Sequence, residues 1–162
     1  MSHLFQRLFI VAITALILSG CLFEKYLEIS DAQFGTFSGN EAKLSNFRAT
    51  SRISFEVDKT YGWIVRLKTN KRKVTLIEEF SLPVAPASWG PEDPYSKRKI
   101  SNFGRTATTT KTVYVINGVI SHSWKIAPGD PSGEHRMLIK IDDKKPVKFK
   151  FVIVDKKIKS KH

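Results

Sequence analysis

The sequence predicts an all-β domain built from antiparallel strands, and three observations support this. Apolar and polar residues alternate over short runs such as residues 53–57 and 147–153, so each run can bury one face and expose the other. Residues 106–116 are rich in β-branched side chains, which favour strands. Clusters of Gly, Pro, Asn and Asp divide these runs, as turns do in a β protein.

The first 21 residues have a different pattern. An apolar run of 11 residues, 8–18, follows Arg7 and leads into Ser19-Gly20-Cys21. As a helix this run is about 16 Å long, whereas the apolar core of a bilayer is about 30 Å thick, so the run is too short to span it. A basic residue, a short apolar run and small residues at its end are typical of a removable signal peptide. An uncleaved anchor that extends to Phe23 is the alternative.

Leu18-Ser19-Gly20-Cys21 resembles the lipobox of bacterial lipoproteins. The resemblance implies that residues 1–20 form a signal helix that is removed, and that Cys21, the only cysteine, becomes lipid-modified and anchors the protein to a membrane. Each buried acyl methylene contributes about 0.8 kcal/mol, so two or three chains hold a protein to a bilayer almost permanently. Leu22 follows the cysteine, and by the same resemblance it favours the outer membrane, with the domain facing the periplasm.

The formal net charge of +12 narrows the classes of partner. Removal of residues 1–20 removes only Arg7, so the mature chain stays strongly basic. Such a chain attracts anionic lipids, lipopolysaccharide or glycans through a field that salt screens within about 10 Å. No nucleic-acid-binding motif accompanies the charge, so nucleic acid is not an expected partner. A solvated surface beside an anionic membrane is the alternative.

The mature chain divides into three parts. Residues 21–31 are expected to be the lipidated N-terminus and a spacer, residues 32–155 the folded domain, and residues 156–162 a basic disordered tail. The domain is expected to open with an edge strand at residues 32–37 and a helical turn or loop at residues 41–48.

Alternating residues predict the next strands, at residues 53–57 and 61–68, with a turn at residues 70–73. Residues 74–82 also read as a strand. Glu78 interrupts their apolar pattern, so we expect a bend or bulge there.

Residues 83–105 are the longest irregular stretch, with four prolines and two glycines. Loops of this length are uncommon in compact domains and are often functional. This one combines aromatic and cationic side chains that suit an anionic glycan or a partner protein. The candidate binding residues are Trp89, Tyr95, Lys97, Arg98 and Lys99. Alternatively, the aromatic residues fold the loop back onto the domain.

Asn117-Gly118 lies between two β-prone runs, which predicts a hairpin with a two-residue type I′ turn. The returning strand carries Ile120, Trp124 and Ile126 on one face, so Trp124 is a core candidate. His122 shares that face and is expected to be a hydrogen-bonded residue at its rim. A last hairpin is predicted from the alternation in residues 137–141 and 147–153.

The final third carries a second resemblance. Trp124, the turn at residues 128–135 and the run at residues 149–153 resemble the C-terminal strands of Ig-like β-sandwich domains. With Tyr61-Gly62 upstream, the sequence is similar to an uncharacterised bacterial family over residues 35–154. The resemblance implies an Ig-like antiparallel β-sandwich, with His135 bonded to nearby backbone where a tyrosine is usual. That family has no described catalytic or binding residues, so it implies none here.

Several classes of activity lack their motifs. The sequence has no Gly-x-Ser-x-Gly elbow, no phosphate-binding glycine loop and no cysteine left after lipidation. A metal site that joins His122, Asp130, Glu134 and His135 matches no standard zinc spacing. We therefore expect a non-enzymatic binding or structural module, without cofactor or metal, whose partner is an envelope protein or an anionic glycan or lipid. The alternatives are a basic docking module for lipopolysaccharide, anionic lipid or wall polymer, and an enzyme with its site in the 83–105 loop.

Overall fold

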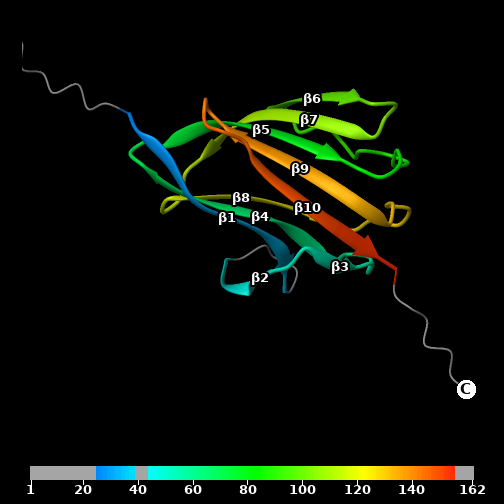
Figure 1. Ribbon diagram of the computed structural model, residues 1–162. Helices are drawn as coiled ribbons and strands as arrows, with labels where there is room; N and C mark the ends of the chain where they lie inside the picture. Colours follow the sequence, from blue (N-terminus) through cyan, green and yellow to red (C-terminus); the bar gives the residue numbers. More distant parts are fainter. Residues whose placement is uncertain (1–24, 39–43, 156–162) are drawn as a thin grey trace, which may run out of the picture.

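The computed structural model describes residues 25–38 and 44–155, which form two packed β-sheets (Figure 1). One sheet has the order β2-β1-β4-β8 and the other the order β3-β10-β9-β5-β7-β6. Neighbouring strands are antiparallel except β3 and β10, which are parallel. The prediction of an all-β sandwich is confirmed. The predicted signal helix, Cys21 and the basic tail lie outside the described residues.

The four-stranded sheet contains β1 (Leu27–Phe37), β2 (Phe47–Ala49), β4 (Thr60–Thr69) and β8 (Val119–Lys125). The six-stranded sheet contains β3 (Arg52–Ser54), β5 (Lys73–Ser81), β6 (Ser96–Ser101), β7 (Thr106–Tyr114), β9 (Gly133–Ile141) and β10 (Val147–Val154). A short 3-10 helix, η1 (Leu44–Asn46), precedes β2. Among these residues no helix is long and apolar enough to cross a membrane.

The core lies between the two sheets and is rich in aromatic rings. Phe34 on β1 stacks on Phe151 of β10, with ring centroids 4.1 Å apart. Trp63 and Ile139 are fully buried on facing sheets. The alternation predicted for β4, β9 and β10 is confirmed, because Val65 and Leu67 are buried whereas Arg66 and Lys68 are exposed, and the other two strands follow the same pattern.

The start of the domain differs from the prediction. β1 begins at Leu27, so the predicted spacer at residues 21–31 is too long by five residues, 27–31. Leu27 is buried and pairs with Thr69, which extends the strand toward the N-terminus. The predicted edge strand is also covered in part, because β2 pairs with the outer side of β1 at residues 35–37.

The strand predicted at residues 53–57 is shorter than expected. β3 ends at Ser54, and Val57 is half exposed in a turn where Asp58 has a positive φ of 67°. The parallel pairing with β10 explains this length, because β10 itself ends at Val154 opposite Ser54.

The turn at Asn117-Gly118 is confirmed, with φ values of 50° and 72°. The expected hairpin is wrong, because β7 and β8 belong to different sheets and only the bridge between Ile116 and Val119 joins them. The turn instead carries the chain across the sandwich, where β8 pairs with β4.

β5 contradicts the predicted bulge. Its pairing with β7 runs without a register shift from Lys73 opposite Tyr114 to Ser81 opposite Thr106. Glu78 keeps the phase of Leu76 and Phe80, and its side chain enters the interior. The predicted 83–105 loop is likewise shorter, because β6 forms within it and pairs with β7.

Candidate functional site

A cavity of about 370 Å³ opens along the edge strand β8, facing the inner side of β5, β6 and β7. We call it the edge cleft. Residues 83–95 and 126–131 contribute to its walls, together with Tyr61 from β4. Its volume lies within the range of natural small-ligand pockets, about 300–1,000 Å³.

One row of the six-stranded sheet gives the edge cleft its polar groups. Glu78 on β5 lies beside Thr109 on β7, which in turn lies beside Arg98 on β6. All three side chains line the edge cleft. The row therefore runs from a buried carboxylate to a partly exposed guanidinium.

Glu78 links the two sheets through its carboxylate. The indole Nε1 of Trp63 donates to Glu78 Oε2 over 2.8 Å, and Nδ1 of His122 lies 3.0 Å from the same oxygen. Glu78 is only 4% exposed. Among residues 25–38 and 44–155, no group donates a hydrogen bond to its Oε1. This oxygen is not completely shielded from solvent. The edge cleft therefore has a carboxylate oxygen free to accept a hydrogen bond from a ligand.

Aromatic rings form the wall beside this carboxylate. Trp124 packs against His122 with ring centroids 4.3 Å apart and stacks on Tyr61 at 6.0 Å. Trp124 is half buried, so part of its indole remains exposed to the edge cleft. Burial, with smaller contributions from Asp130 and Glu78, raises the pKa of Tyr61 far above its ordinary value. Its phenol therefore remains protonated at physiological pH.

His135 is bonded to nearby backbone, as the second resemblance implies. Its Nδ1 lies 2.9 Å from the carbonyl oxygen of Gly133, and its ring stacks on Phe151 at 5.0 Å. Burial lowers the pKa of His135, although the Gly133 carbonyl and Asp130 oppose this shift. Within the described residues, no group of three or more His, Cys, Asp or Glu side chains is positioned to hold a metal ion.

The five predicted binding residues do not form one site. Trp89 donates from Nε1 to the Gly104 carbonyl over 2.8 Å and packs on Phe80. The Arg98 guanidinium donates to the carbonyls of Trp89, Gly90 and Pro91 over 2.9–3.1 Å. These two residues therefore line the edge cleft and also hold its wall together.

The other three predicted residues point elsewhere. Tyr95 is 89% exposed, and Lys97 and Lys99 project from the outer face of β6. The same outer face of the six-stranded sheet also carries Lys148 and Lys150 on β10 and Arg136 and Lys140 on β9. Glu134 offsets part of this charge, because hydrogen bonds from Lys150 and Arg136 lower its pKa. We call this surface the basic face.

Sequence reasoning missed Glu78 as a site residue, although a signal was present. Val74, Leu76, Glu78 and Phe80 recur every second residue, so Glu78 continues the buried face rather than interrupting it. A carboxylate in a buried phase requires polar partners from the opposite sheet. Trp63 and His122 meet that requirement, but the sequence does not indicate which strands face each other.

The fold defines this chain as an Ig-like β-sandwich. Residues 32–154 match the model of the PM0630 beta sandwich domain, and the chain belongs to that family. An immunoglobulin-like protein from Pseudomonas aeruginosa has a similar structure, with a TM-score of 0.53 and 13% identity over 80% of this chain and 97% of that one. The bacterial hydrophobin BslA matches with a TM-score of 0.35 and 12% identity over 80% and 98%. No curated protein matches the sequence.

Proposed function

We propose that this protein is a lipid-anchored module of the bacterial cell envelope, held through Cys21 at the outer membrane and facing the periplasm. Its β-sandwich binds without catalysis, and the edge cleft holds one unit of an anionic glycan. The observation that carries this proposal is that two residues line the same cavity: Glu78, whose Oε1 accepts no hydrogen bond from the described residues, and the partly exposed Trp124.

The chemistry of the edge cleft suits a sugar unit that carries an acid group. A half-buried indole offers an apolar plane against which a sugar ring can lie. The carboxylates of Glu78 and Asp130 accept hydrogen bonds from hydroxyl groups. Lys111 and Lys125 line the same cavity and complement a ligand carboxylate or phosphate. The strongly basic sequence supports an anionic ligand rather than a neutral one.

An envelope enzyme is the second candidate, because Glu78 and His122 form a carboxylate–imidazole pair beside a cavity. Binding is favoured over catalysis because Glu78 Oε2 already contacts both Trp63 Nε1 and His122 Nδ1. These contacts give this oxygen a role in joining the two sheets. Hydrolysis of a glycoside ordinarily takes two carboxyl groups on opposite sides of the bond. Asp93 and Asp130 also line the edge cleft. Each already accepts from a backbone amide, Asp93 Oδ1 from Tyr95 and Asp130 Oδ2 from Ala127.

Replacement of Trp124 by alanine tests the edge cleft. We expect Trp124→Ala to weaken the binding of uronate-containing oligosaccharides about tenfold in calorimetric titration, because the aromatic contact is lost. Tyr95→Ala is the matched control, since Tyr95 is exposed and outside the cavity, and its affinity should equal that of the wild type. Equal losses in both variants, or no binding by the wild type, would contradict the proposal. Cleavage of the oligosaccharide that disappears in Glu78→Gln would support the enzyme instead.

A further inference from the structure

The end of the sandwich where β1 begins gathers four segments that are far apart in the sequence. These are residues 25–28, the β4–β5 turn with the strand ends beside it (68–73), the β7–β8 turn with Tyr114 (114–118) and the β9–β10 turn (142–146). The register brings them together, because Leu27 pairs with Thr69, Lys73 with Tyr114, and Leu76 with Ile141. Figure 1 shows them at the left end, where β1 begins, whereas β10 ends at the other end. We call this surface the tether end.

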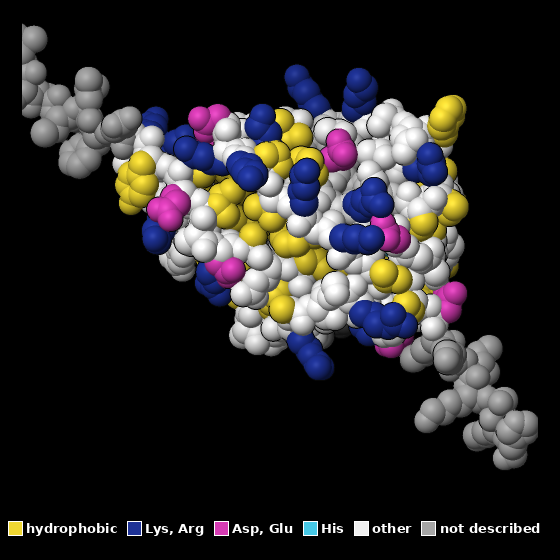
Figure 2. Space-filling view, in the orientation of Figure 1, with side chains coloured by type: hydrophobic (Ala, Val, Ile, Leu, Met, Phe, Trp, Pro, Cys, Tyr) yellow, Lys and Arg dark blue, Asp and Glu magenta, His cyan; other side chains and the backbone are white. Residues whose placement is uncertain are grey.

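The tether end is basic. Within the described residues, its cations without an ion-pair partner are Lys25, Arg72, Lys73, Lys144 and Lys145. Two further lysines are paired, Lys68 with Glu28 and Lys71 with Asp142. Asp143 is the remaining acid of these segments. Figure 2 shows Lys and Arg side chains on this end, beside exposed hydrophobic ones.

Large side chains project from the same surface. Tyr26 is 55% exposed, Tyr114 is 70% exposed and Ile116 is 65% exposed. Tyrosine is enriched where proteins meet the interface of a membrane, because its ring is apolar and its hydroxyl stays hydrated. Basic residues close to tyrosines therefore match the chemistry of an anionic lipid headgroup layer.

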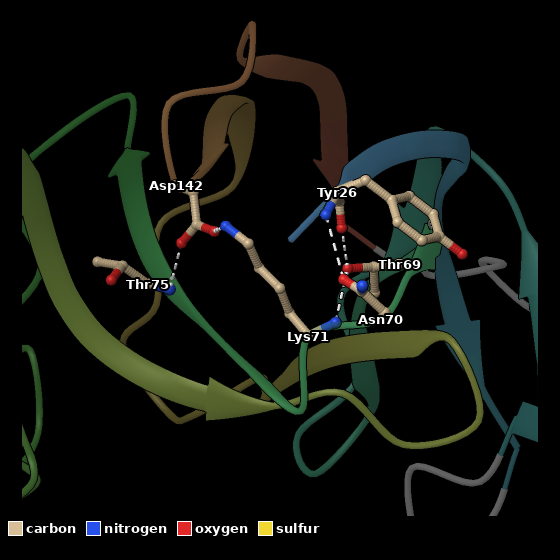
Figure 3. Close-up of polar contacts among 6 residues, drawn as sticks. All are labelled: Tyr26, Thr69, Asn70, Lys71, Thr75 and Asp142. Atoms are coloured by element: carbon tan, nitrogen blue, oxygen red, sulfur yellow. Dashed lines mark hydrogen bonds and ion pairs between the residues drawn. The ribbon is translucent and has the colours of Figure 1, made fainter. Parts of the chain in front are cut away.

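The polar contacts in Figure 3 hold the tether end in a fixed shape. Lys71 Nζ lies 2.7 Å from Asp142 Oδ2, and the Thr75 amide donates to Asp142 Oδ1 over 2.8 Å. Burial opposes ionisation of Asp142, but the hydrogen bonds from Lys71 and Thr75 prevail and lower its pKa. These contacts join the β4–β5 turn to the β9–β10 turn.

Two more contacts attach the first described residues to the same turn. The Tyr26 amide donates to Asn70 Oδ1 over 3.1 Å, and the Thr69 hydroxyl donates to the Tyr26 carbonyl. The start of β1 is therefore fixed to the β4–β5 turn, and the surface does not have to become ordered when it binds a partner.

The length of chain before β1 indicates which partner is within reach. Only six residue steps separate Cys21 from Leu27, so the chain between them spans at most about 21 Å. If Cys21 carries the lipid anchor, as we propose above, this end of the sandwich stays close to the headgroups. The electric field of an anionic surface extends about 8 Å at physiological ionic strength. A tether of this length allows the cations of the tether end to come within that distance.

We propose that the tether end docks on the surface of an anionic phospholipid bilayer. The sandwich then stands on its three turns, and residues 83–95 and 126–131 of the edge cleft face away from the membrane. This orientation follows because β5 runs from the tether end at Lys73 to the opposite end at Ser81, where residues 83–95 begin. The inference rests on the lipid anchor proposed above.

A site-specific label tests this orientation in the lipidated protein. With Cys21 acylated, a cysteine introduced at Asn117 is the only thiol, and Asn102→Cys provides a matched label in the β6–β7 turn at the opposite end. Each protein is reconstituted in vesicles of phosphatidylcholine alone or with about 30% phosphatidylglycerol, and iodide quenching of a fluorophore on the thiol is measured. We expect quenching at position 117 to fall at least about threefold in anionic vesicles and to recover in high salt, and quenching at position 102 to stay constant.

Charge reversal identifies the surface responsible. The triple variant Arg72→Glu, Lys73→Glu and Lys145→Glu should restore quenching at position 117 to its value in neutral vesicles. The matched triple variant Lys97→Glu, Lys99→Glu and Lys150→Glu reverses the same charge on the basic face, away from the β9–β10 turn, and should leave the protection intact. Equal quenching at position 117 in both kinds of vesicle, or loss of protection in both triple variants, would overturn the docking proposal. A protein that washes off the vesicles would instead refute the lipid anchor, so the two failures are distinguishable.

Discussion

Replacement of Gly62 by alanine is expected to cause a large loss of stability. A Cβ atom at this position would lie 2.1 Å from the carbonyl oxygen of His122, on the neighbouring strand β8. Backbone on both sides fixes this contact, so the sheet must deform. Overpacking typically costs about 1–3 kcal/mol and occasionally more, and because backbone cannot turn aside as a side chain can, we expect a loss of about 3 kcal/mol here. This is a large share of the roughly 5–15 kcal/mol that stabilises a typical domain.

Denaturant unfolding, followed by the fluorescence of Trp63, Trp89 and Trp124, measures this loss because all three indoles are buried or half buried. Gly129→Ala is the control. Nothing lies within 4 Å of a Cβ there, so only its left-handed φ of 85° contributes, at about 1–2 kcal/mol. If Gly62→Ala were as stable as Gly129→Ala, the backbones of β4 and β8 would not approach each other at Gly62 as closely as the structure has them.

The second large effect is expected at Phe151, whose ring joins the two sheets. It is fully buried and packs on Phe34, Phe80 and His135. Phe151→Ala should lower the free energy of unfolding by about 3–5 kcal/mol, because it removes a large apolar side chain and leaves a cavity.

The same substitution at Phe103 provides the comparison. Phe103 is 94% exposed in the β6–β7 turn, so Phe103→Ala should change stability by no more than about 0.5 kcal/mol. Similar losses at both positions in urea unfolding curves would contradict the assignment of Phe151 to the interface between the sheets.

The edge cleft follows from the unequal widths of the two sheets. β8 ends the four-stranded sheet, whereas β7 and β6 continue the six-stranded sheet beyond β5. The inner side of β6 and β7 is therefore not covered by a strand of the other sheet, and residues 83–95 and 126–131 complete the enclosure. Polar residues such as Thr109 and Arg98 are compatible with this partly exposed inner surface.

Local patterns in the sequence predicted the strands better than their pairing. Alternation located β4, β9 and β10, and Asn117-Gly118 predicted its turn, because these features depend on neighbours in the chain. β8 pairs with β4, which lies more than 50 residues earlier in the chain. The local pattern around Asn117-Gly118 cannot indicate such a distant partner, so it predicts a hairpin instead. β6 escaped notice because its Lys- and Ser-rich sequence pairs at an edge and buries little.

The candidate site was predicted only in part, for the same physical reason. Trp89 and Arg98 reach the edge cleft, whereas Tyr95, Lys97 and Lys99 project away from it, because side chains on a strand alternate between two faces. Glu78 was interpreted as a fault in a strand, because its partners Trp63 and His122 come from the other sheet. A single sequence does not indicate which strands of the two sheets lie opposite each other.

Intact-mass spectrometry of the protein extracted from membranes tests the central proposal most directly. We predict a chain that begins at Cys21 and carries the added mass of two or three acyl chains, with residues 1–20 absent. A chain that begins at Met1 and carries an unmodified cysteine thiol would contradict the lipid anchor, and with it the envelope location and the orientation of the tether end.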